Sequence, residues 1–176
     1  MGWWSVADLV THMCTALIFK GLTRGGFVGP MVLGTVLPDL SSRVPTMLVD
    51  AAVRAGAPIP LQVMYPFAVL HMPIGNLALC GLLAFLFRRD QRLQLFTWLW
   101  IGSLFHFAVD MLQAHHGQGY YMLFPFTTAT SELGVFGSEA TIPWVPVTVA
   151  VTAAVWGWRV WRQRVASVSP APYDDA

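Results

Sequence analysis

The segment from Leu93 to Leu112, LQLFTWLWIGSLFHFAVDML, decides the fold of this chain. A helix that crosses the hydrocarbon core of a bilayer needs about 20 predominantly apolar residues, and this segment has that length. Its two ionisable side chains, His106 and Asp110, lie toward its carboxyl end. Because an ionisable group inside a bilayer is costly, it marks a functional site by default. The segment therefore predicts a membrane-spanning helix that carries part of a site.

The composition of the whole chain agrees with a membrane protein. Of its 176 residues, 56% are hydrophobic and 11% are charged, whereas soluble domains carry about 25% charged residues. Lys and Arg total 10 and Asp and Glu total 9, so the charges cannot form the basic patch that binds nucleic acid. Nucleic acid is therefore excluded as a partner, and membrane lipids are the expected surroundings.

Four further apolar stretches predict the remaining helices. Leu61–Phe87 contains no Lys, Arg, Asp or Glu and supplies a second span, and Pro143–Trp161 supplies a third. Val6–Phe19 and Phe27–Leu40 are shorter, at roughly 21 Å each as helices, and form either tilted spans or a hairpin that returns to the same side. The sequence thus predicts an all-α, polytopic membrane helical bundle of about five transmembrane or partly re-entrant helices.

The basic residues predict the orientation of the spans, because cytoplasmic loops are enriched in Lys and Arg. With the N-terminus outside, Arg43 and Arg54 fall on the external side. The others face the cytoplasm: Lys20, Arg24, Arg88, Arg89, Arg92, Arg159, Arg162 and Arg164. We therefore expect one integral membrane domain over residues 1–164 and a disordered cytoplasmic tail over residues 165–176.

Prolines predict where the helices are irregular. Pro38 lies late in its apolar stretch and is expected to kink or end the helix near Asp39. Thr46–Ala55 is then expected to form a separate, interfacial helix. The stretch that begins at Leu61 is expected to become regular after Pro66 and to kink again at Pro73.

His106 and Asp110 are spaced i and i+4, so they share one face of their helix. An imidazole nitrogen and a carboxylate oxygen at this spacing can bind one cation, or the acid can orient the imidazole as its hydrogen-bond partner. A hydrogen bond between neighbouring turns, with no ligand, fits the pair equally well. The pair alone leaves both interpretations open.

Three more ionisable residues lie at the same predicted depth. Measured from the outer ends of their helices, His12, Asp39, His71, His106 and Asp110 all fall within roughly 0–10 Å. A lone histidine in an apolar helix is usually a packed core residue, but three histidines and two aspartates in one layer indicate a metal site. Nitrogen and carboxylate oxygen ligands suit Zn²⁺ best, with Mn²⁺ or Fe²⁺ as alternatives.

The order of these residues resembles the YdjM-like family, LexA-regulated inner-membrane proteins described as metal-dependent hydrolases. The resemblance covers Ala7 to Thr128. It is carried by His12, Gly34-Thr-Val-Leu-Pro38-Asp39, His71, Gly102-x3-His106-x3-Asp110 and Leu123-Phe-Pro125-Phe126. It implies a bacterial inner-membrane location and a metal-dependent hydrolytic activity.

The chain departs from the family pattern at two places. The family usually has Pro-Asp-x-Asp-His where this chain has Pro38-Asp39-Leu40-Ser41-Ser42, and it has His-Arg-Gly-x-Thr-His where only His71 matches and Pro66 replaces the first histidine. His115 and His116 are additional histidines that could compensate. Two interpretations follow: one metal ion where relatives hold more, or a diverged member with weakened or absent catalysis.

As a hydrolase, the protein would act on a phosphoester or lipid-like ester through a metal-activated water at the external side of the bilayer. His115 or His116 would serve as general acid or base, unless the pair is only an exposed, adventitious metal-binding pair. Ala114–Ile142 is expected to be an external loop, and its aromatic segment Tyr120–Phe126 would anchor it at the interface or cap the site.

Two alternatives belong to other classes. The first is a non-catalytic membrane protein whose polar His/Asp layer fixes helix packing. The second is a metal or proton transporter, which would need polar groups along the inner half of the bundle as well. Gly75–Phe87 has Asn76 as its polar residue, so the sequence disfavours a transport path.

Overall fold

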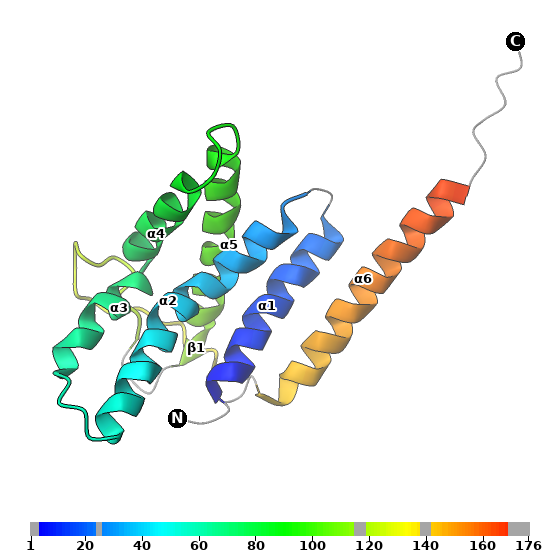
Figure 1. The fold of residues 1–176 in the computed structure, drawn as a ribbon. Helices are drawn as coiled ribbons and strands as arrows, with labels where there is room; N and C mark the ends of the chain where they lie inside the picture. Colours follow the sequence, from blue (N-terminus) through cyan, green and yellow to red (C-terminus); the bar gives the residue numbers. More distant parts are fainter. Residues whose placement is uncertain (1–3, 24–25, 115–118, 138–141, 169–176) are drawn as a thin grey trace, which may run out of the picture.

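The computed structural model describes residues 4–23, 26–114, 119–137 and 142–168 (Figure 1). About three-quarters of these residues are helical, which confirms the all-α prediction. The helices are α1 (Trp4–Leu22), α2 (Val28–Arg54), the short 3-10 turn η1 (Leu61–Met64), α3 (Tyr65–Leu70), α4 (Pro73–Phe85), α5 (Arg92–Leu112) and α6 (Val145–Val168). Two-residue strands, β1 (Gln113–Ala114) and β2 (Phe136–Gly137), pair in parallel.

The long helices run alongside one another in alternating directions (Figure 1). Helix α2 packs against α1 and α5, α4 packs against α5, and α6 packs against α1. The α1–α2 connection, the α4–α5 loop and the carboxyl end of α6 lie at one end of the molecule, which we call the basic end because the α4–α5 loop region carries Arg88, Arg89 and Arg92. The start of α1 and the described part of the loop after α5 lie at the opposite end.

Helix α2 is the main correction to the sequence prediction. It continues through Pro38 and Pro45 as one helix from Val28 to Arg54. The expectation that the helix ends near Asp39 is therefore wrong, and Thr46–Ala55 is not a separate helix but nearly all part of α2.

Helix α5 supplies a hydrogen-bond donor that replaces the one missing at Pro38 of α2. Proline has no backbone N–H, so Pro38 leaves the carbonyl of Gly34, four residues earlier, without its helical donor. The hydroxyl of Ser103 on α5 donates to this carbonyl at 3.0 Å, and it also lies 3.1 Å from the carbonyl of Leu99 in its own helix. Because Ser103 is fully buried, a hydroxyl group of the neighbouring helix, in place of water, donates to the carbonyl that Pro38 leaves without a donor.

Replacing Ser103 with alanine is expected to lower the free energy of unfolding by about 1–3 kcal/mol, because a buried carbonyl loses its donor. Thr97 is the matched control: it lies on the same helix, is exposed, and its hydroxyl bonds only to Leu93 of its own helix at 2.8 Å. Thr97→Ala should change stability by less than about 0.5 kcal/mol. Denaturant unfolding in detergent measures both, and equal losses would contradict the role given to Ser103.

Glycines allow α2 and α5 to approach at backbone distance. A Cβ atom at Gly34 would fall on the carbonyl oxygen of Leu99, and one at Gly102 would fall on the carbonyl oxygen of Met31. Small residues permit this close approach between helices. The contact brings the middle of α2, with Asp39, against the part of α5 that carries His106.

The stretch predicted as one span, Leu61–Phe87, is broken in the structure. Helix α3 begins at Tyr65, with Pro66 in its first turn, and ends before His71. Helix α4 begins at Pro73, and residues 62–70 and 73–85 meet at an angle of 74°. The kink expected at Pro73 is confirmed, but it is a full break with His71 at its corner.

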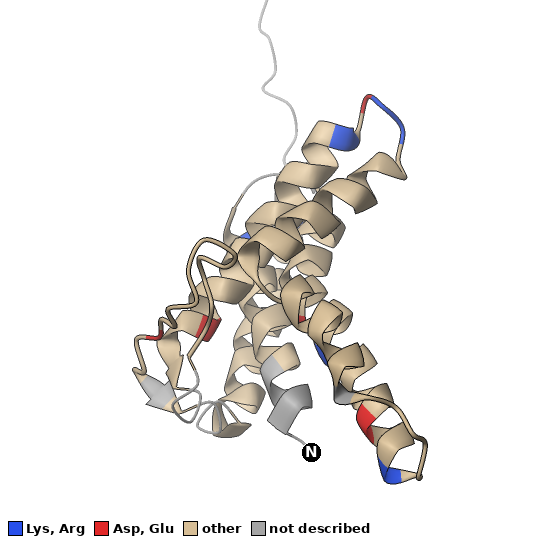
Figure 2. Ribbon diagram, turned by 90° about the vertical axis from the view of Figure 1, so that its left-hand side faces the viewer, with Lys and Arg blue, Asp and Glu red and all other residues tan. Residues whose placement is uncertain are grey.

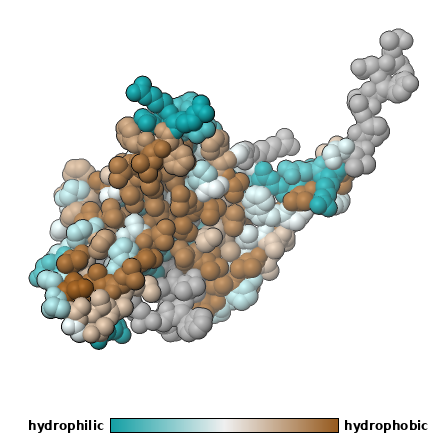
Figure 3. Space-filling model, viewed as in Figure 1, coloured by the Kyte–Doolittle hydropathy of each residue, from teal (hydrophilic) through white to brown (hydrophobic). Residues whose placement is uncertain are grey.

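One face of the described fold is apolar across its middle (Figure 3). Helix α5 is the one helix among the described residues that is long and apolar enough to cross a membrane by itself, and the bent pair of residues 62–70 and 73–85 would supply a second span. Hydrophobic side chains cover the middle of the face in Figure 3, and hydrophilic ones gather at the α4–α5 loop and the end of α6. Figure 2 shows Lys and Arg at the tip of the α4–α5 loop and at the far end of α2.

Helix α6 contains most of the predicted span Pro143–Trp161 and continues to Val168. The tail expected over residues 165–176 therefore begins with helical residues. Residues 169–176 lie outside the described part of the chain.

Candidate metal centre

The structure brings the five predicted ligands into one buried cluster. Asp39 comes from α2, His71 from the corner between α3 and α4, and His12 from α1, while α5 contributes the other two, His106 and Asp110. The side chains of His12, His106 and Asp110 are fully buried, that of Asp39 is 4% exposed and that of His71 is 13% exposed. Four segments that are distant in sequence thus meet at one point.

His106 occupies the middle of the cluster, and its ring is oriented by the backbone of α2. Its Nδ1 lies 2.9 Å from the carbonyl oxygen of Thr35. A carbonyl can only accept, so Nδ1 carries the proton, and Nε2 of the neutral ring then presents an electron pair. A metal-binding histidine is typically held in this way by an acceptor behind the ring.

Electron-pair donors surround Nε2 of His106. Nε2 of His71 lies 3.2 Å away, and Oδ1 of Asp39 lies 3.9 Å from Nε2 of His106 and 3.3 Å from Nε2 of His71. Ligands about 2.0–2.1 Å from a tetrahedral zinc ion stand roughly 3.3 Å apart. We call Asp39, His71 and His106 the outer triad; two of its spacings match the edges of such a tetrahedron, and the third, 3.9 Å, is longer.

A second group of three residues shares His106. Oδ1 of Asp110 lies 3.1 Å from Nε2 of His12, and Oδ2 lies 3.1 Å from Nε2 of His106. The rings of His12 and His106 stack with their centroids 4.0 Å apart. We call His12, His106 and Asp110 the inner triad. Because Nδ1 of His106 carries a proton, Nε2 is the nitrogen that can bind a metal. A single ion bound to Nε2 therefore belongs to either the outer or the inner triad.

The carboxylates of the cluster have unused acceptor capacity. Oδ2 of Asp39 is buried and has no hydrogen-bond partner among the described residues, and the two buried oxygens of Asp110 face imidazole nitrogens at 3.1 Å. Leaving buried acceptors unsatisfied is costly; a cation in the outer triad would bind the carboxylate of Asp39, and one in the inner triad would bind that of Asp110. The two groups of buried histidine and aspartate residues could each hold a metal ion.

Arg43 supports the outer triad from one turn further along α2. Its Nε lies 2.6 Å from Oδ1 of Asp39, and its side chain is 31% exposed. A charge-assisted hydrogen bond of this kind orients the carboxylate. The sequence interpretation used Arg43 only to set the orientation of the chain; its i, i+4 spacing from Asp39 was the signal that could have placed it beside the site.

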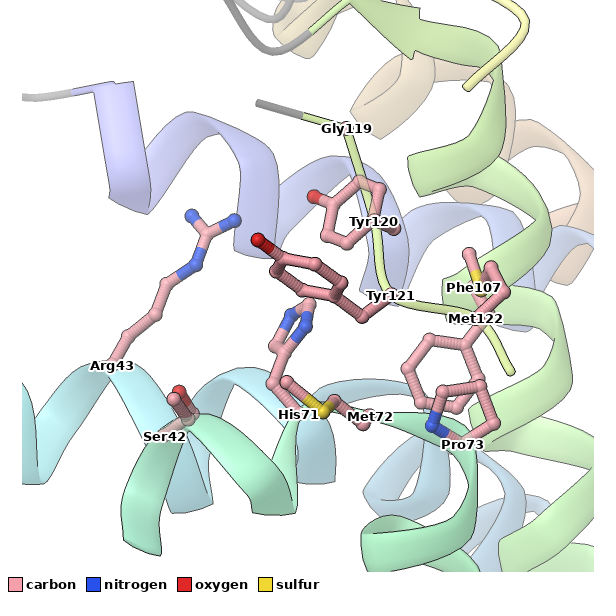
Figure 4. A pocket seen from close by; sticks show the side chains of 11 residues that line it. Ser42, Arg43, His71, Met72, Pro73, Phe107, Gly119, Tyr120, Tyr121 and Met122 are labelled. Carbon is pink, nitrogen blue, oxygen red and sulfur yellow. The ribbon is translucent and has the colours of Figure 1, made fainter. Parts of the chain in front are cut away.

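A cavity of about 270 Å³ gives access to the outer triad at His71. Figure 4 shows His71 between Arg43 on one side and Met72, Pro73 and Phe107 on the other. The ring of Tyr120 stacks on that of His71 with centroids 5.6 Å apart. The outer triad therefore borders an opening, whereas the three members of the inner triad are sealed within the described part of the fold.

The loop after α5 covers this opening. Tyr120 pairs with Ser131 through two backbone hydrogen bonds of 3.1 and 2.9 Å, which fixes the position of the loop segment that lines the cavity. Part of the predicted loop Ala114–Ile142 thus reaches the site. His115 and His116, the predicted acid or base residues, lie outside the described residues.

Comparison with known proteins returns no match: no protein family, no curated protein and no solved structure matches this chain.

Proposed function

We propose that this protein is a membrane-embedded, metal-dependent hydrolase of the YdjM-like type, acting on a phosphoester or lipid-like ester at the external side of the bilayer. One observation carries the proposal: the outer triad brings three possible ligand atoms within 3.9 Å of one another beside an open cavity. Catalytic zinc sites have three protein ligands and an open fourth position, whereas structural sites are closed.

The membrane location is supported by the distribution of apolar and charged side chains. Large hydrophobic residues are exposed on the long helices, including Leu82 on α4 and Leu104 on α5. As helices, α1 and α5 would extend ~28 and ~31 Å, close to the ~30 Å hydrocarbon core of a bilayer. The proposed orientation places the basic end in the cytoplasm and the cluster in the external half, with the N-terminus outside.

The donor set favours Zn²⁺, with Mn²⁺ or Fe²⁺ as alternatives, because it combines imidazole nitrogen with carboxylate oxygen. A bound ion of this kind would lower the pKa of a water ligand toward neutrality and polarise a phosphoryl or acyl oxygen. Nε2 of His71, Nε2 of His106 and Oδ1 of Asp39 would hold it. The Thr35 carbonyl and Arg43 would keep two of these ligands in place.

The remaining residues would handle the proton and the surroundings. Oδ2 of Asp110 lies 3.6 Å from Nε2 of His71 and 3.1 Å from Nε2 of His106, so this carboxylate stands beside the outer triad and can accept a proton from the attacking water. His115 and His116 remain proposed as the acid that protonates the leaving group. Phe107 and the stacked ring of Tyr120 would form the aromatic walls of the cavity beside His71.

Metal content and hydrolysis test the proposal directly. The full chain, purified in a neutral detergent without added chelator, is expected to hold roughly one zinc ion per chain. It should hydrolyse bis(p-nitrophenyl) phosphate or p-nitrophenyl butyrate, lose this activity on dialysis against 1,10-phenanthroline, and regain it with added Zn²⁺. Protein that neither holds metal nor hydrolyses either ester would contradict the proposal.

The sealed inner triad favours a second candidate, a non-catalytic membrane protein with a structural polar layer. The stacked rings of His12 and His106 and the buried carboxylate of Asp110 have the form of a polar contact between α1 and α5. Interhelical hydrogen bonds of this kind contribute about 0.6–2 kcal/mol in membranes. This candidate would be supported instead if the wild-type protein holds no metal and His12→Ala lowers the free energy of unfolding.

A further inference from the structure

A second cavity continues the one beside His71. It measures about 280 Å³ and shares Ser42, Arg43 and Ala68 with the first cavity. It then follows α2 and α3 and is lined by Met47, Met64 and Tyr65. The two cavities therefore adjoin at these residues, and we call them together the groove, with Arg43 at the junction.

The two halves of the groove differ in character. On the metal side, the hydroxyl groups of Tyr120 and Tyr121 point toward the side on which Arg43 lies (Figure 4). Beyond Arg43, the walls between α2 and α3 are mainly apolar, with Met47, Met64 and Ala68 among them. Methionine side chains adapt to flexible apolar partners. A charged and polar part next to the triad thus continues into an apolar channel.

Arg43 links the two halves. Its Nε is held by Oδ1 of Asp39 at 2.6 Å, and this same oxygen belongs to the outer triad. An anion at the guanidinium is therefore one residue away from the position of the ion. A phosphoryl group presents oxygens on several sides, so one oxygen can face Arg43 while another faces the triad, and arginine is the preferred partner of phosphate oxygens.

We propose that the substrate is a single-chain alkyl phosphate ester, with its phosphate at Arg43 and its chain in the apolar part of the groove between α2 and α3. This inference rests on the proposed function, because it names the substrate of the same site. In the reaction, the oxygen of water forms a bond to phosphorus, the bond between phosphorus and the chain oxygen breaks, and the chain leaves as an alcohol that takes up a proton.

Binding to metal-depleted protein tests the substrate class without relying on catalysis. Butyl, hexyl and octyl phosphate are titrated against the full chain in phosphatidylcholine nanodiscs, with empty nanodiscs subtracted, and binding is followed by calorimetry. Each methylene that enters the groove should tighten binding about fourfold, the equivalent of ~0.8 kcal/mol. Met47→Trp, at a position that lines the second cavity but not the first, should weaken the dependence on chain length.

The chain offers a close control for the charge. Arg54 lies on the same helix as Arg43 and pairs with Asp50 at the same i, i+4 spacing, but it lines neither cavity. Arg43→Gln should weaken octyl phosphate binding at least tenfold, and Arg43→Lys should restore part of it. Arg54→Gln should change it less than twofold, and octanoate and octanol should bind wild-type protein at least tenfold more weakly than octyl phosphate.

The outcomes separate this inference from the proposed function. Equal losses in Arg43→Gln and Arg54→Gln, no effect of chain length, or equal binding of octanoate would overturn the substrate assignment, even if the protein holds zinc and cleaves bis(p-nitrophenyl) phosphate. Conversely, chain-dependent phosphate binding through Arg43 in a protein that never holds metal would support the binding site and contradict the hydrolase.

Discussion

Replacing His106 with alanine is expected to remove the bound metal and to lower the rate of ester hydrolysis by more than about 100-fold. The loss of a hydrogen-bond partner behind a metal ligand already costs 10–100-fold in affinity or activity, and this substitution deletes the ligand itself. His106 belongs to both triads and is held by the carbonyl of Thr35 at 2.9 Å. An ion in either triad of the described cluster therefore loses a ligand when His106 is replaced.

The measurement is zinc content by mass spectrometry, together with the hydrolysis rate, on protein that remains monodisperse in detergent. Cys80→Ala is the matched control, because Cys80 is buried to the same extent, carries a potential metal ligand, and bonds to Asn76 and Ser103 instead of the cluster. It should retain full zinc content. Zinc retained in His106→Ala would contradict both the site and the proposed function.

Two further substitutions extend this prediction to the choice of triad. If the ion lies in the outer triad, His71→Ala should lose zinc, whereas His12→Ala should retain it and mainly lose stability. His71 stands at the corner between α3 and α4 and is partly exposed, so its replacement disturbs little packing. The opposite pattern would place the ion in the sealed inner triad and would favour the structural role.

The sequence was sufficient to predict α5 and the shared face of its two ionisable residues. The predicted segment Leu93–Leu112 differs from α5 by one residue, because an unbroken apolar run of this length has few alternatives. The i, i+4 spacing of His106 and Asp110 then follows from helix geometry. The meeting of His12, Asp39 and His71 with this pair also followed from counting residues along antiparallel helices.

Helix α2 could not be predicted from its own residues. Proline inside a helix costs about 3 kcal/mol when the freed carbonyl has no other partner. Here the hydroxyl of Ser103, which is 69 residues away in sequence, bonds to the carbonyl of Gly34. The general tendency of proline to end a helix does not hold at Pro38, because the compensating contact forms only after α2 and α5 have packed.

The detailed geometry of the site was equally out of reach. The orientation of His106 depends on the carbonyl of Thr35, a backbone group that no side-chain pattern reports. The approach of His71 depends on a bend of 74° between two helical segments that read as one apolar span. Arg43 was visible in the sequence, but its charge was assigned to topology, so its contact with Asp39 was overlooked.

Replacing Gly102 with alanine is expected to destabilise the protein by about 3 kcal/mol, the upper part of the range for overpacked cores. A Cβ atom at this position would fall on the carbonyl oxygen of Met31 and lie 2.8 Å from the backbone nitrogen of Thr35. Backbone atoms of a packed helix cannot rotate away as a side chain can. Helices α2 and α5 must therefore move apart, whereas in most small-to-large substitutions a neighbouring side chain can move instead.

The same displacement should weaken metal binding, because the separated helices carry the two halves of the cluster. Thr35 and Asp39 lie on α2, whereas His106 lies on α5, so a shift between the helices lengthens both the hydrogen bond behind the ring and the spacing of the outer triad.

Gly81→Ala is the control of opposite sign: nothing lies within 4 Å of a Cβ at Gly81 in α4, and alanine there should stabilise the helix by up to about 1 kcal/mol. Denaturant unfolding and zinc titration of the two variants are compared. If Gly102→Ala matched Gly81→Ala in both stability and zinc affinity, the α2–α5 contact could not be what positions the site; a joint loss in Gly102→Ala alone would show that helix packing and metal affinity depend on the same contact.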